Sequence, residues 1–354
     1  MIYHIFGNSP YTKKFIDFLI SNRSNFGLEN HYFLIHSPKG SAFDIPDIKN
    51  CNYKISSNSW WFIQAFKYLK KNDKIIIHQL ANPRLLLYLF FNRKYIKQCR
   101  WSIWGGDVYF FRNRKNNIKT RCIEHLRKSI IPRIPVISSF IKGDFEVVQS
   151  VYSSKARYIF AFYPNPIDYN LINKYKNIKK DNYEITFLVG NSGNPENNQC
   201  EILDILSKFK NENIKIIVPL SYGEKPHIDF VKCYGKKLFG DKFVALTEFL
   251  PPEKYIQLLA GVDVAIMNHN YQQALGNIIA IIALGKKVYL KKEATPYQFF
   301  KMNGIKVYNS DELSKQNFKE IIQFSSEISR TNELNQQLLL SLDKNISGWQ
   351  EMFE

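Results

Sequence analysis

The 354-residue chain has no CxxC pair, and its five cysteines are scattered without a histidine cluster nearby. This absence argues against a disulfide framework or a zinc site and favours a reducing compartment. No run of about 18 apolar residues occurs, so we expect no segment to span a membrane. The first residues, MIYHIFGNSPYTKK, lack a basic leader followed by an apolar stretch. We expect them to form a strand rather than a signal peptide.

Acidic residues are also scarce. Asp and Glu number 31 against 49 Lys and Arg, which gives a formal net charge of +18. Nucleic acid, an anionic membrane surface and anionic small molecules are therefore all possible partners. The chain has no Asp-x-Asp pair, the usual carboxylate arrangement for a metal–diphosphate complex. We predict no metal and no cofactor, and we expect helix dipoles, neutral donors and a basic side chain to hold any diphosphate.

Short apolar runs alternate with longer amphipathic runs, a pattern that predicts parallel sheets with helical crossovers. The predicted strands are 2–7, 31–36, 74–80, 100–105, 135–139 and 157–163, followed by 184–191, 214–221, 243–249, 262–268, 286–290 and 305–309. A proline-bearing polar stretch separates the two series. We predict an α/β protein of two Rossmann-like domains facing across a cleft, at residues 1–165 and 184–354, with a linker at 166–183 and helices at the C-terminal end.

The second half places polar, glycine-bearing turns after several predicted strands. GNSG follows one strand, SYG follows the next, and QQALGN precedes a strongly apolar helix. Glycine lets the backbone approach a ligand closely, and a helix N-terminus suits a phosphate; the alternative for each turn is an ordinary loop or cap. Several such turns in one domain favour a nucleotide site. Its candidate residues are Gly190, Asn191, Ser192, Ser221, Tyr222, Gly223, Glu248, Gln272, Gln273, Gly276 and Asn277.

The segment WSIWGGDVYFF places a carboxylate after two glycines within an apolar run. Asp107 could take a proton from an attacking hydroxyl, and the glycines would leave room for the substrate. The alternative is structural, because Asp in a turn often satisfies backbone N–H groups. His78 is the other candidate base, although a lone histidine at a strand end is more often structural. The candidates for lining the cleft beside the acceptor are Asn8, Gln79, Trp104, Gly105 and Gly106.

Taken together, WSIWGGDVYFF, ITFLVGNSG, IKIIVPLSYG, QQALGN and the terminal GWQ resemble glycosyltransferase family 56. The resemblance runs over nearly the whole chain and keeps the order of the motifs. It implies a GT-B fold in which the N-terminal domain binds the acceptor and the C-terminal domain holds the sugar nucleotide. It also implies transfer of a deoxy or deoxy-amino sugar, 4-acetamido-4,6-dideoxygalactose or a fucose-like sugar, from a nucleotide diphosphate, with dTDP as the expected nucleotide.

The same resemblance implies a saccharide acceptor linked to undecaprenyl diphosphate, in the synthesis of common antigen or O-antigen. The enzyme would then be peripheral on the cytoplasmic face of the bacterial inner membrane. Two alternatives from the residues stay open. One is a basic nucleic-acid-binding protein, and the other is a nucleotide-sugar epimerase of the same fold. The glycine-bearing turns favour the transferase, so we expect no nucleic-acid partner.

Residues 112–133 carry eight Lys or Arg against a single acid, Glu124. Apolar positions recur at spacings of three to four, which predicts an amphipathic helix with a cationic face. The predicted stripe consists of Ile118, Cys122, His125, Leu126 and Ile130. We interpret the segment as an interfacial helix on an anionic membrane, and the alternative is that the stripe packs on the domain core. The membrane-contacting cations would be Arg112, Arg114, Lys115, Lys119 and Arg121.

Overall fold

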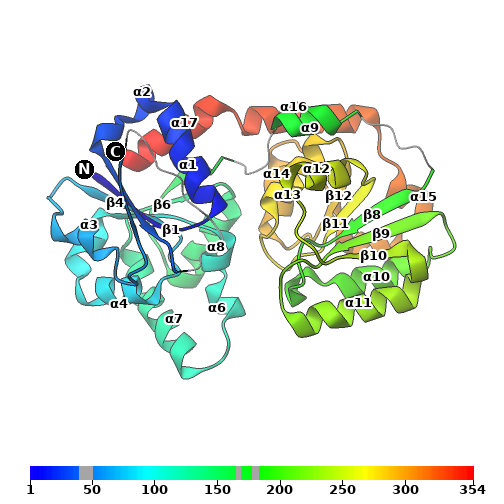
Figure 1. The fold of residues 1–354 in the computed structure, drawn as a ribbon, viewed down its shortest axis with the longest axis horizontal. Helices are drawn as coiled ribbons and strands as arrows, with labels where there is room; N and C mark the ends of the chain where they lie inside the picture. The colour runs from blue at the N-terminus through cyan, green and yellow to red at the C-terminus, as the bar shows by residue number, and fades with distance from the viewer. Residues whose placement is uncertain (40–50, 165–168, 178–182) are drawn as a thin grey trace. The chain divides into compact units, whose positions relative to one another are not determined.

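The computed structural model describes residues 1–39, 51–164, 169–177 and 183–354. The chain forms two compact units (Figure 1). The first comprises Met1–Pro166 together with Ser341–Glu354, and the second comprises Ile167–Leu340. This division differs from the predicted one at the C-terminal end, because the final helix belongs to the first unit rather than the second.

The first unit is built on a parallel sheet with strand order β3-β2-β1-β4-β5-β6-β7. Its strands are β1 (Ile2–Gly7), β2 (His31–His36), β3 (Asn52–Ser56), β4 (Lys74–His78), β5 (Cys99–Ser102), β6 (Val136–Ser139) and β7 (Arg157–Phe160). Its α-helices are α1 (Pro10–Ser21), α2 (Arg23–Phe26), α3 (Ile63–Lys67), α4 (Pro83–Phe91), α5 (Gly105–Val108), α6 (Phe110–Asn113), α7 (Ile118–Ile130), α8 (Lys142–Tyr152) and α17 (Leu342–Phe353). Strand β3 was not predicted, and all of its side chains are exposed or only half-buried.

Helix α17 joins the first unit through its apolar side. Trp349 is fully buried, its ring centroid lies 4.4 Å from that of Phe15, and its Nε1 donates to the carbonyl of Phe162 at 3.0 Å. Gly348 allows this approach, because a Cβ there would lie 2.0 Å from the carbonyl oxygen of Phe160. A large aromatic side chain buried with its N–H satisfied is a strong local anchor. The terminal GWQ segment therefore has a packing role in the N-terminal domain.

The second unit has a parallel sheet with strand order β10-β9-β8-β11-β12-β13. Its strands are β8 (Ile185–Val189), β9 (Ile214–Pro219), β10 (Phe243–Leu246), β11 (Val264–Met267), β12 (Lys287–Leu290) and β13 (Tyr308–Asn309). Its α-helices are α9 (Tyr169–Tyr175), α10 (Gln199–Ser207), α11 (Lys225–Phe239), α12 (Pro252–Ala260), α13 (Leu275–Ala283), α14 (Thr295–Met302), α15 (Phe318–Ile322) and α16 (Ser326–Leu339). Helix α9 lies inside the predicted linker and packs on α12.

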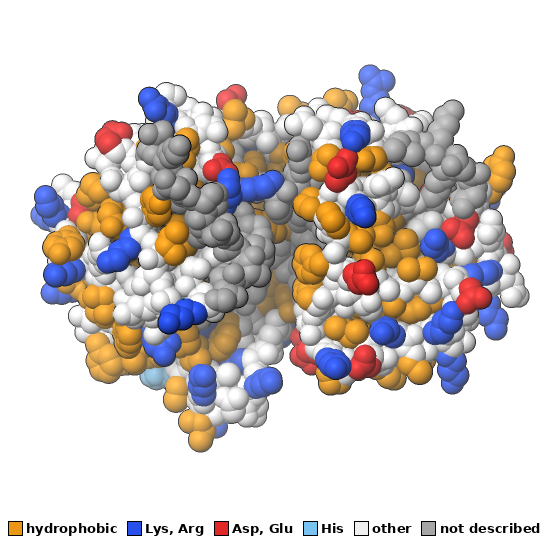
Figure 2. Space-filling view, viewed as in Figure 1, with side chains coloured by type: hydrophobic (Ala, Val, Ile, Leu, Met, Phe, Trp, Pro, Cys, Tyr) orange, Lys and Arg blue, Asp and Glu red, His pale blue; other side chains and the backbone are white. Residues whose placement is uncertain are grey.

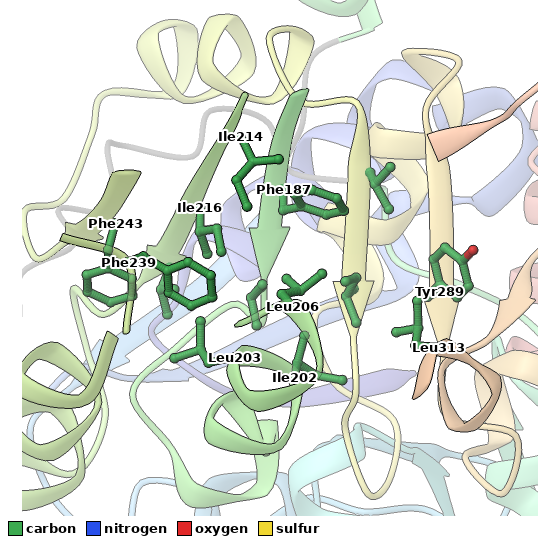
Figure 3. Close-up of a cluster of buried hydrophobic side chains, with 14 of the residues drawn as sticks. Phe187, Ile202, Leu203, Leu206, Ile214, Ile216, Phe239, Phe243, Tyr289 and Leu313 are labelled. Carbon is green, nitrogen blue, oxygen red and sulfur yellow. The ribbon is translucent and has the colours of Figure 1, made fainter. Parts of the chain in front are cut away.

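The core of the second unit lies between its sheet and helices α10 and α11, as Figure 3 shows. Buried side chains of the central strands, such as Phe187 and Ile216, face Leu203 and Leu206 of α10. Continuous apolar strands are expected for a parallel sheet covered on both faces. In both units the strand order reverses beside the first strand, at β1/β4 and at β8/β11. Ligands of doubly wound sheets bind at such switch points, beyond the carboxyl ends of the strands.

Candidate functional site

Polar turns meet at the carboxyl edge of the second sheet, on both sides of its switch point. The turn after β8 pairs with the turn after β9 through a parallel bridge between Gly193 and Gly223. Gly193 N donates to the carbonyl of Tyr222 at 2.7 Å, and Asn191 Nδ2 donates to the Tyr222 hydroxyl at 2.9 Å. Asn191 and Tyr222 lie some 30 residues apart in the sequence, but their two turns form one surface in the folded protein.

Two glycines make this contact possible. A Cβ on Gly193 would lie 2.1 Å from Cγ1 of Ile228, which leaves no room for a side chain. Gly223 adopts φ +134, and a Cβ there would lie 2.6 Å from the carbonyl oxygen of Gly193. Only glycine tolerates both the positive φ and the close approach of the two backbones. These positions were chosen from the sequence for ligand approach, and the structure also gives them a packing role.

The buried side chain of Asn197 holds the turns of the site together, a role that the sequence did not indicate. It is fully buried, and its Oδ1 accepts from Asn191 N at 2.8 Å, Ser192 N at 3.3 Å and His269 Nε2 at 3.1 Å. Its Nδ2 donates to Ser192 Oγ at 3.1 Å and to Gln273 Oε1 at 3.3 Å. One side chain thus fixes the turns after β8 and β11 together. Burial lowers the pKa of His269 to about 3, so this ring is neutral and donates to the amide.

The predicted nucleotide residues divide into two groups. Asn191, Ser192, Tyr222 and Gln273 are joined through the contacts above, with Gly190 and Gly223 supplying positive φ in the turns and Ser221 next to them. Gln272 lies in the same loop as Gln273, whereas Gly276 and Asn277 lie in the first turn of α13. Glu248 lies after β10, exposed to solvent. Asn191 Oδ1 is buried and accepts no hydrogen bond from any described residue.

Lys291 is a cation at this edge that was not among the residues predicted from the sequence. It follows β12 directly and donates from Nζ to Asn270 Oδ1 at 3.1 Å. Asn270 in turn accepts from Asn198 Nδ2 at 3.0 Å, and Asn198 takes the left-handed conformation, φ 50, before α10. The signal was present in the sequence, because Lys-Lys follows the apolar strand ending at Leu290.

In the first unit, Asp107 is buried and surrounded by donors. Its Oδ2 accepts from Leu80 N at 2.7 Å and Trp101 Nε1 at 2.8 Å, and its Oδ1 accepts from Trp104 N at 2.8 Å. Burial raises its pKa to about 6, while the Arg127 charge and these N–H groups oppose the rise. The contacts correspond to the structural alternative for Asp107, in which the carboxylate ties together the loops after β4 and β5. Its role as the base stays a prediction.

His78 belongs to a buried chain of hydrogen bonds. The Phe26 carbonyl can only accept, so His31 Nε2 donates to it at 3.0 Å, and His31 Nδ1 accepts from His4 Nε2 at 2.9 Å. His4 Nδ1 then accepts from His78 Nε2 at 2.9 Å, and His78 Nδ1 accepts from the Tyr163 hydroxyl. Burial lowers the pKa of His31 to about 4 and those of the other two well below 6.5. Both nitrogens of His78 are therefore engaged inside the protein, and Tyr163 is the outermost group of the chain.

The remaining predicted acceptor residues lie after β1, β4 and β5. Asn8 donates to Ser37 Oγ at 2.9 Å, and Gln79 takes a left-handed φ of 76. The ring of Trp104 lies 4.7 Å from each of Tyr11 and Tyr163, so these three aromatic side chains form one half-buried group. Gly105 and Gly106 open helix α5, and a Cβ on Gly106 would meet nothing within 4 Å. Such a group of aromatic rings beside open space suits contact with a sugar ring.

Helix α7 forms within the predicted amphipathic segment, but of the predicted stripe only Ile130 is fully buried. The buried residues are Glu124, Arg127 and Ile130, whereas Ile118, Cys122 and His125 are exposed. Leu126 is half-buried. Arg127 explains the difference, because its guanidinium donates to the carbonyls of Leu80 at 2.7 Å and Asp107 at 2.6 Å. A polar anchor thus holds α7 to the domain in place of the apolar core contact that was the alternative for this stripe, and the membrane role of the segment stays a prediction.

Among residues 1–39, 51–164, 169–177 and 183–354, no three His, Cys, Asp or Glu side chains gather in a way that could hold a metal ion. Metal independence of the reaction stays a prediction. The helices of the described part of the chain are all too short or too polar to cross a bilayer.

Comparison with known proteins decides the family. The model of the 4-alpha-L-fucosyltransferase family, glycosyl transferase group 56, matches residues 12–350. The chain belongs to glycosyltransferase group 56. This confirms the resemblance drawn from the motifs, and it makes the protein a hexosyltransferase that uses a nucleotide-sugar donor and a saccharide acceptor.

Two solved structures of similar fold have low sequence identity to this chain. An α,α-trehalose 6-phosphate synthase from Burkholderia multivorans shares 8% identity at a TM-score of 0.65, over 99% of this chain and 95% of that chain. WaaG, a glycosyltransferase involved in lipopolysaccharide biosynthesis, shares 9% at a TM-score of 0.63, over 100% and 99%. At such identities the likeness concerns the fold alone. This group 56 chain has the GT-B fold, as its motifs predicted.

Proposed function

We propose that this enzyme transfers a deoxy or deoxy-amino sugar, fucose-like or 4-acetamido-4,6-dideoxygalactose, from dTDP to a lipid-linked saccharide. The observation that carries the proposal is the set of turns held together by Asn197 at the switch point of the second sheet, in a chain of group 56. The acceptor would be a saccharide on undecaprenyl diphosphate, in the assembly of common antigen or O-antigen. The enzyme would work as a peripheral protein at the cytoplasmic face of the bacterial inner membrane.

The donor half of the proposal rests on the chemistry of the second unit. Asn191 Oδ1 is a buried acceptor without a hydrogen bond from the described residues, so a ligand hydroxyl or N–H would satisfy it. Gln272 and Gln273 can donate to ribose or phosphate oxygens. Helix α13 directs its first N–H groups toward this loop, and Lys291 adds a full positive charge. Together these groups would stabilise the charge that develops on the leaving diphosphate.

The acceptor half rests on the first unit. We propose that the rings of Tyr11, Trp104 and Tyr163 contact a sugar of the acceptor, next to the open space at Gly106. The attacking hydroxyl needs a base, and Asp107 and His78 remain the candidates from the sequence. Each already uses its polar atoms inside the protein, so the variant of Asp107 described in the Discussion is the test that separates a chemical from a structural role.

Two other functions make different predictions. A nucleic-acid-binding protein would be retained on DNA in a salt-dependent way and would gain no stability from any nucleotide diphosphate. An epimerase of the same fold would turn over the sugar nucleotide without an acceptor. A ligand that is present at 100 times its Kd adds about 2.7 kcal/mol to the free energy of unfolding. Thermal unfolding with dTDP, UDP, GDP and CMP therefore shows in one experiment which of these nucleotides the protein binds.

The sharpest test of the donor site uses two neighbouring lysines. Lys291→Gln should weaken dTDP binding at least tenfold, about 1.4 kcal/mol, because it removes the cation from the loop cluster. Lys292→Gln makes the same charge change at an exposed neighbour and should leave the affinity within about twofold. Isothermal titration of both variants gives the comparison. Equal affinities of the two variants would place the diphosphate elsewhere.

A further inference from the structure

The stretch of residues 83–133, which includes helices α4 and α7, is cationic and has no exposed acid. Residues 83–133 contain Asp107 and Glu124 as their acids, and both are buried. The exposed cations of the same stretch are Arg84, Arg93, Lys94, Lys97, Arg112, Lys115, Lys119, Arg121, Lys128 and Arg133. Positive charge is therefore concentrated on one part of the first unit, and no exposed carboxylate of that stretch neutralises it.

Large apolar side chains are exposed on the same two helices. Leu87 and Phe91, one turn apart on α4, are 41% and 74% exposed, and Ile118 at the start of α7 is 80% exposed. Exposed apolar side chains that gather within a polar rim are typical of protein or membrane interaction sites, whereas single exposed apolar side chains are common on any surface. Figure 2 shows hydrophobic and basic side chains interspersed over the part of the first unit that α4 and α7 occupy, without acidic side chains among them.

The two helices that carry these side chains are adjacent. Helices α4 and α7 pack against each other, and the rings of Phe90 and His125 lie 6.3 Å apart. His125 belongs to the outward face of α7 with Ile118 and Cys122, while Phe90 adjoins Phe91 at the end of α4. The exposed apolar residues therefore lie on two adjacent helices rather than in a stripe on α7 alone.

We propose that α4 and α7 together form a docking surface for an anionic lipid bilayer, in which Leu87, Phe91 and Ile118 enter the boundary between headgroups and acyl chains. The surrounding cations would contact the headgroups. An apolar face flanked by Lys and Arg is the usual composition of helices that lie in a membrane interface. Nucleic acid would use the cations but would leave three exposed aliphatic and aromatic side chains in water.

The purpose of this surface rests on the proposed lipid-linked acceptor, because such a substrate has to be met at a bilayer. The structure also links the surface to the proposed acceptor loops. Arg127 of α7 holds the carbonyls of Leu80 and Asp107, which lie in the loops after β4 and β5. A bilayer bound at α7 would therefore contact a helix that is hydrogen-bonded to these two loops, and the loop after β5 carries Trp104.

The test is co-sedimentation of the full chain with vesicles of phosphatidylglycerol and phosphatidylethanolamine, in comparison with phosphatidylcholine vesicles. The apolar variant combines Leu87→Ala, Phe91→Ala and Ile118→Ala, and the charge variant combines Lys115→Gln, Lys119→Gln and Arg121→Gln. All six side chains are exposed, so both variants should fold. Arg114 is left unchanged, because its Nε and Nη1 are buried.

The wild type should pellet with the anionic vesicles and be released by salt. The charge variant should lose about 100-fold in partitioning, since each cation near an anionic leaflet contributes about 1 kcal/mol. The apolar variant should lose roughly tenfold or more. Matched controls in the second unit should bind like the wild type: Lys232→Gln, Lys237→Gln and Lys254→Gln for charge, and Phe230→Ala, Met302→Ala and Leu338→Ala for apolar surface.

Wild-type binding by the apolar variant would overturn the inference, because charge alone would then account for the adsorption. Binding to DNA with the same dependence on Lys115, Lys119 and Arg121, and none to vesicles, would overturn it in favour of nucleic acid. The assay contains neither nucleotide nor acceptor. Failure here is therefore distinct from failure of the proposed function, which would appear as a lack of dTDP binding.

Discussion

Asp107→Asn separates the two roles of the carboxylate in the Trp-Gly-Gly-Asp turn. The amide keeps the size of the side chain but offers one accepting oxygen in place of two. If that oxygen serves Leu80 N and Trp101 Nε1, the new NH2 group faces the N–H of Trp104, 2.8 Å away in the present contact. A buried donor left without a partner costs about 1–3 kcal/mol, and hydrogen bonds to charged groups are the stronger ones.

Loss of the negative charge removes the attraction to the buried Arg127 guanidinium, which retains Glu124 at 3.7 Å, but it also removes the desolvation cost that raises the pKa of Asp107, so these two effects oppose each other. The unpaired donor therefore dominates, and we expect a total of about 2 kcal/mol. For a unit of this size the melting temperature should fall by about 4–8 °C. Transfer measured at low temperature, where the variant is still folded, should stay within about tenfold of the wild type.

The assay is thermal unfolding of purified Asp107→Asn, followed by single-turnover transfer well below its melting temperature. Asp17→Asn is the control, because it makes the same charge change at an exposed carboxylate on α1. Its melting temperature should be almost unchanged. An unaltered melting temperature of Asp107→Asn, together with a fall in turnover of about 10²–10⁴ and normal nucleotide affinity, would refute the structural reasoning and make Asp107 the base.

Further predictions concern pH, packing and metal. Since the pKa of His31 is lowered to about 4 from 6.5, the unfolded chain takes up its proton first, and stability should fall by about 3 kcal/mol as the pH drops through this range. Urea unfolding at pH 7 and pH 5 should show a smaller loss of stability in His31→Asn than in the wild type. The raised pKa of Asp107 changes stability in the opposite direction, but it does so in both proteins and does not affect the comparison. An equal loss in the two proteins would mean that the His31 ring has an ordinary pKa in the folded state. Gly193→Ala should destabilise the second unit by about 1–3 kcal/mol, because the new Cβ would clash with Ile228. Gly7→Ala should cause no such loss of stability, because a Cβ there meets nothing within 4 Å. Urea midpoints measure this, and equal midpoints would contradict the packing role. Transfer activity should survive EDTA, and a complete loss that Mg²⁺ or Mn²⁺ restores would reject the metal-free account of the diphosphate.

The sequence by itself determined the fold class, the family and most strands. Alternating apolar and amphipathic runs reflect which residues face a core, and this information is local along the chain. The predicted strands 2–7 and 31–36 coincide with β1 and β2. Strand β3 was missed because its pattern is largely exposed, as expected for a strand at the edge of a sheet. Glycine-bearing turns were also visible locally, and they led to the residues around Gly190 and Gly223.

Only the tertiary structure decided how buried polar side chains find their partners. Asn197 joins turns after two strands, and His4, His31 and His78 form a chain across three strands, because the fold brings their positions together from distant parts of the sequence. The outward face of α7 was decided in the same way. Periodicity marked Ile118 as part of an apolar stripe, but the hydrogen bonds of Arg127 to loops far along the chain turned the first half of that stripe toward solvent. Hydrophobic periodicity records that a helix has two faces, whereas the partners available in the folded domain determine which face is buried.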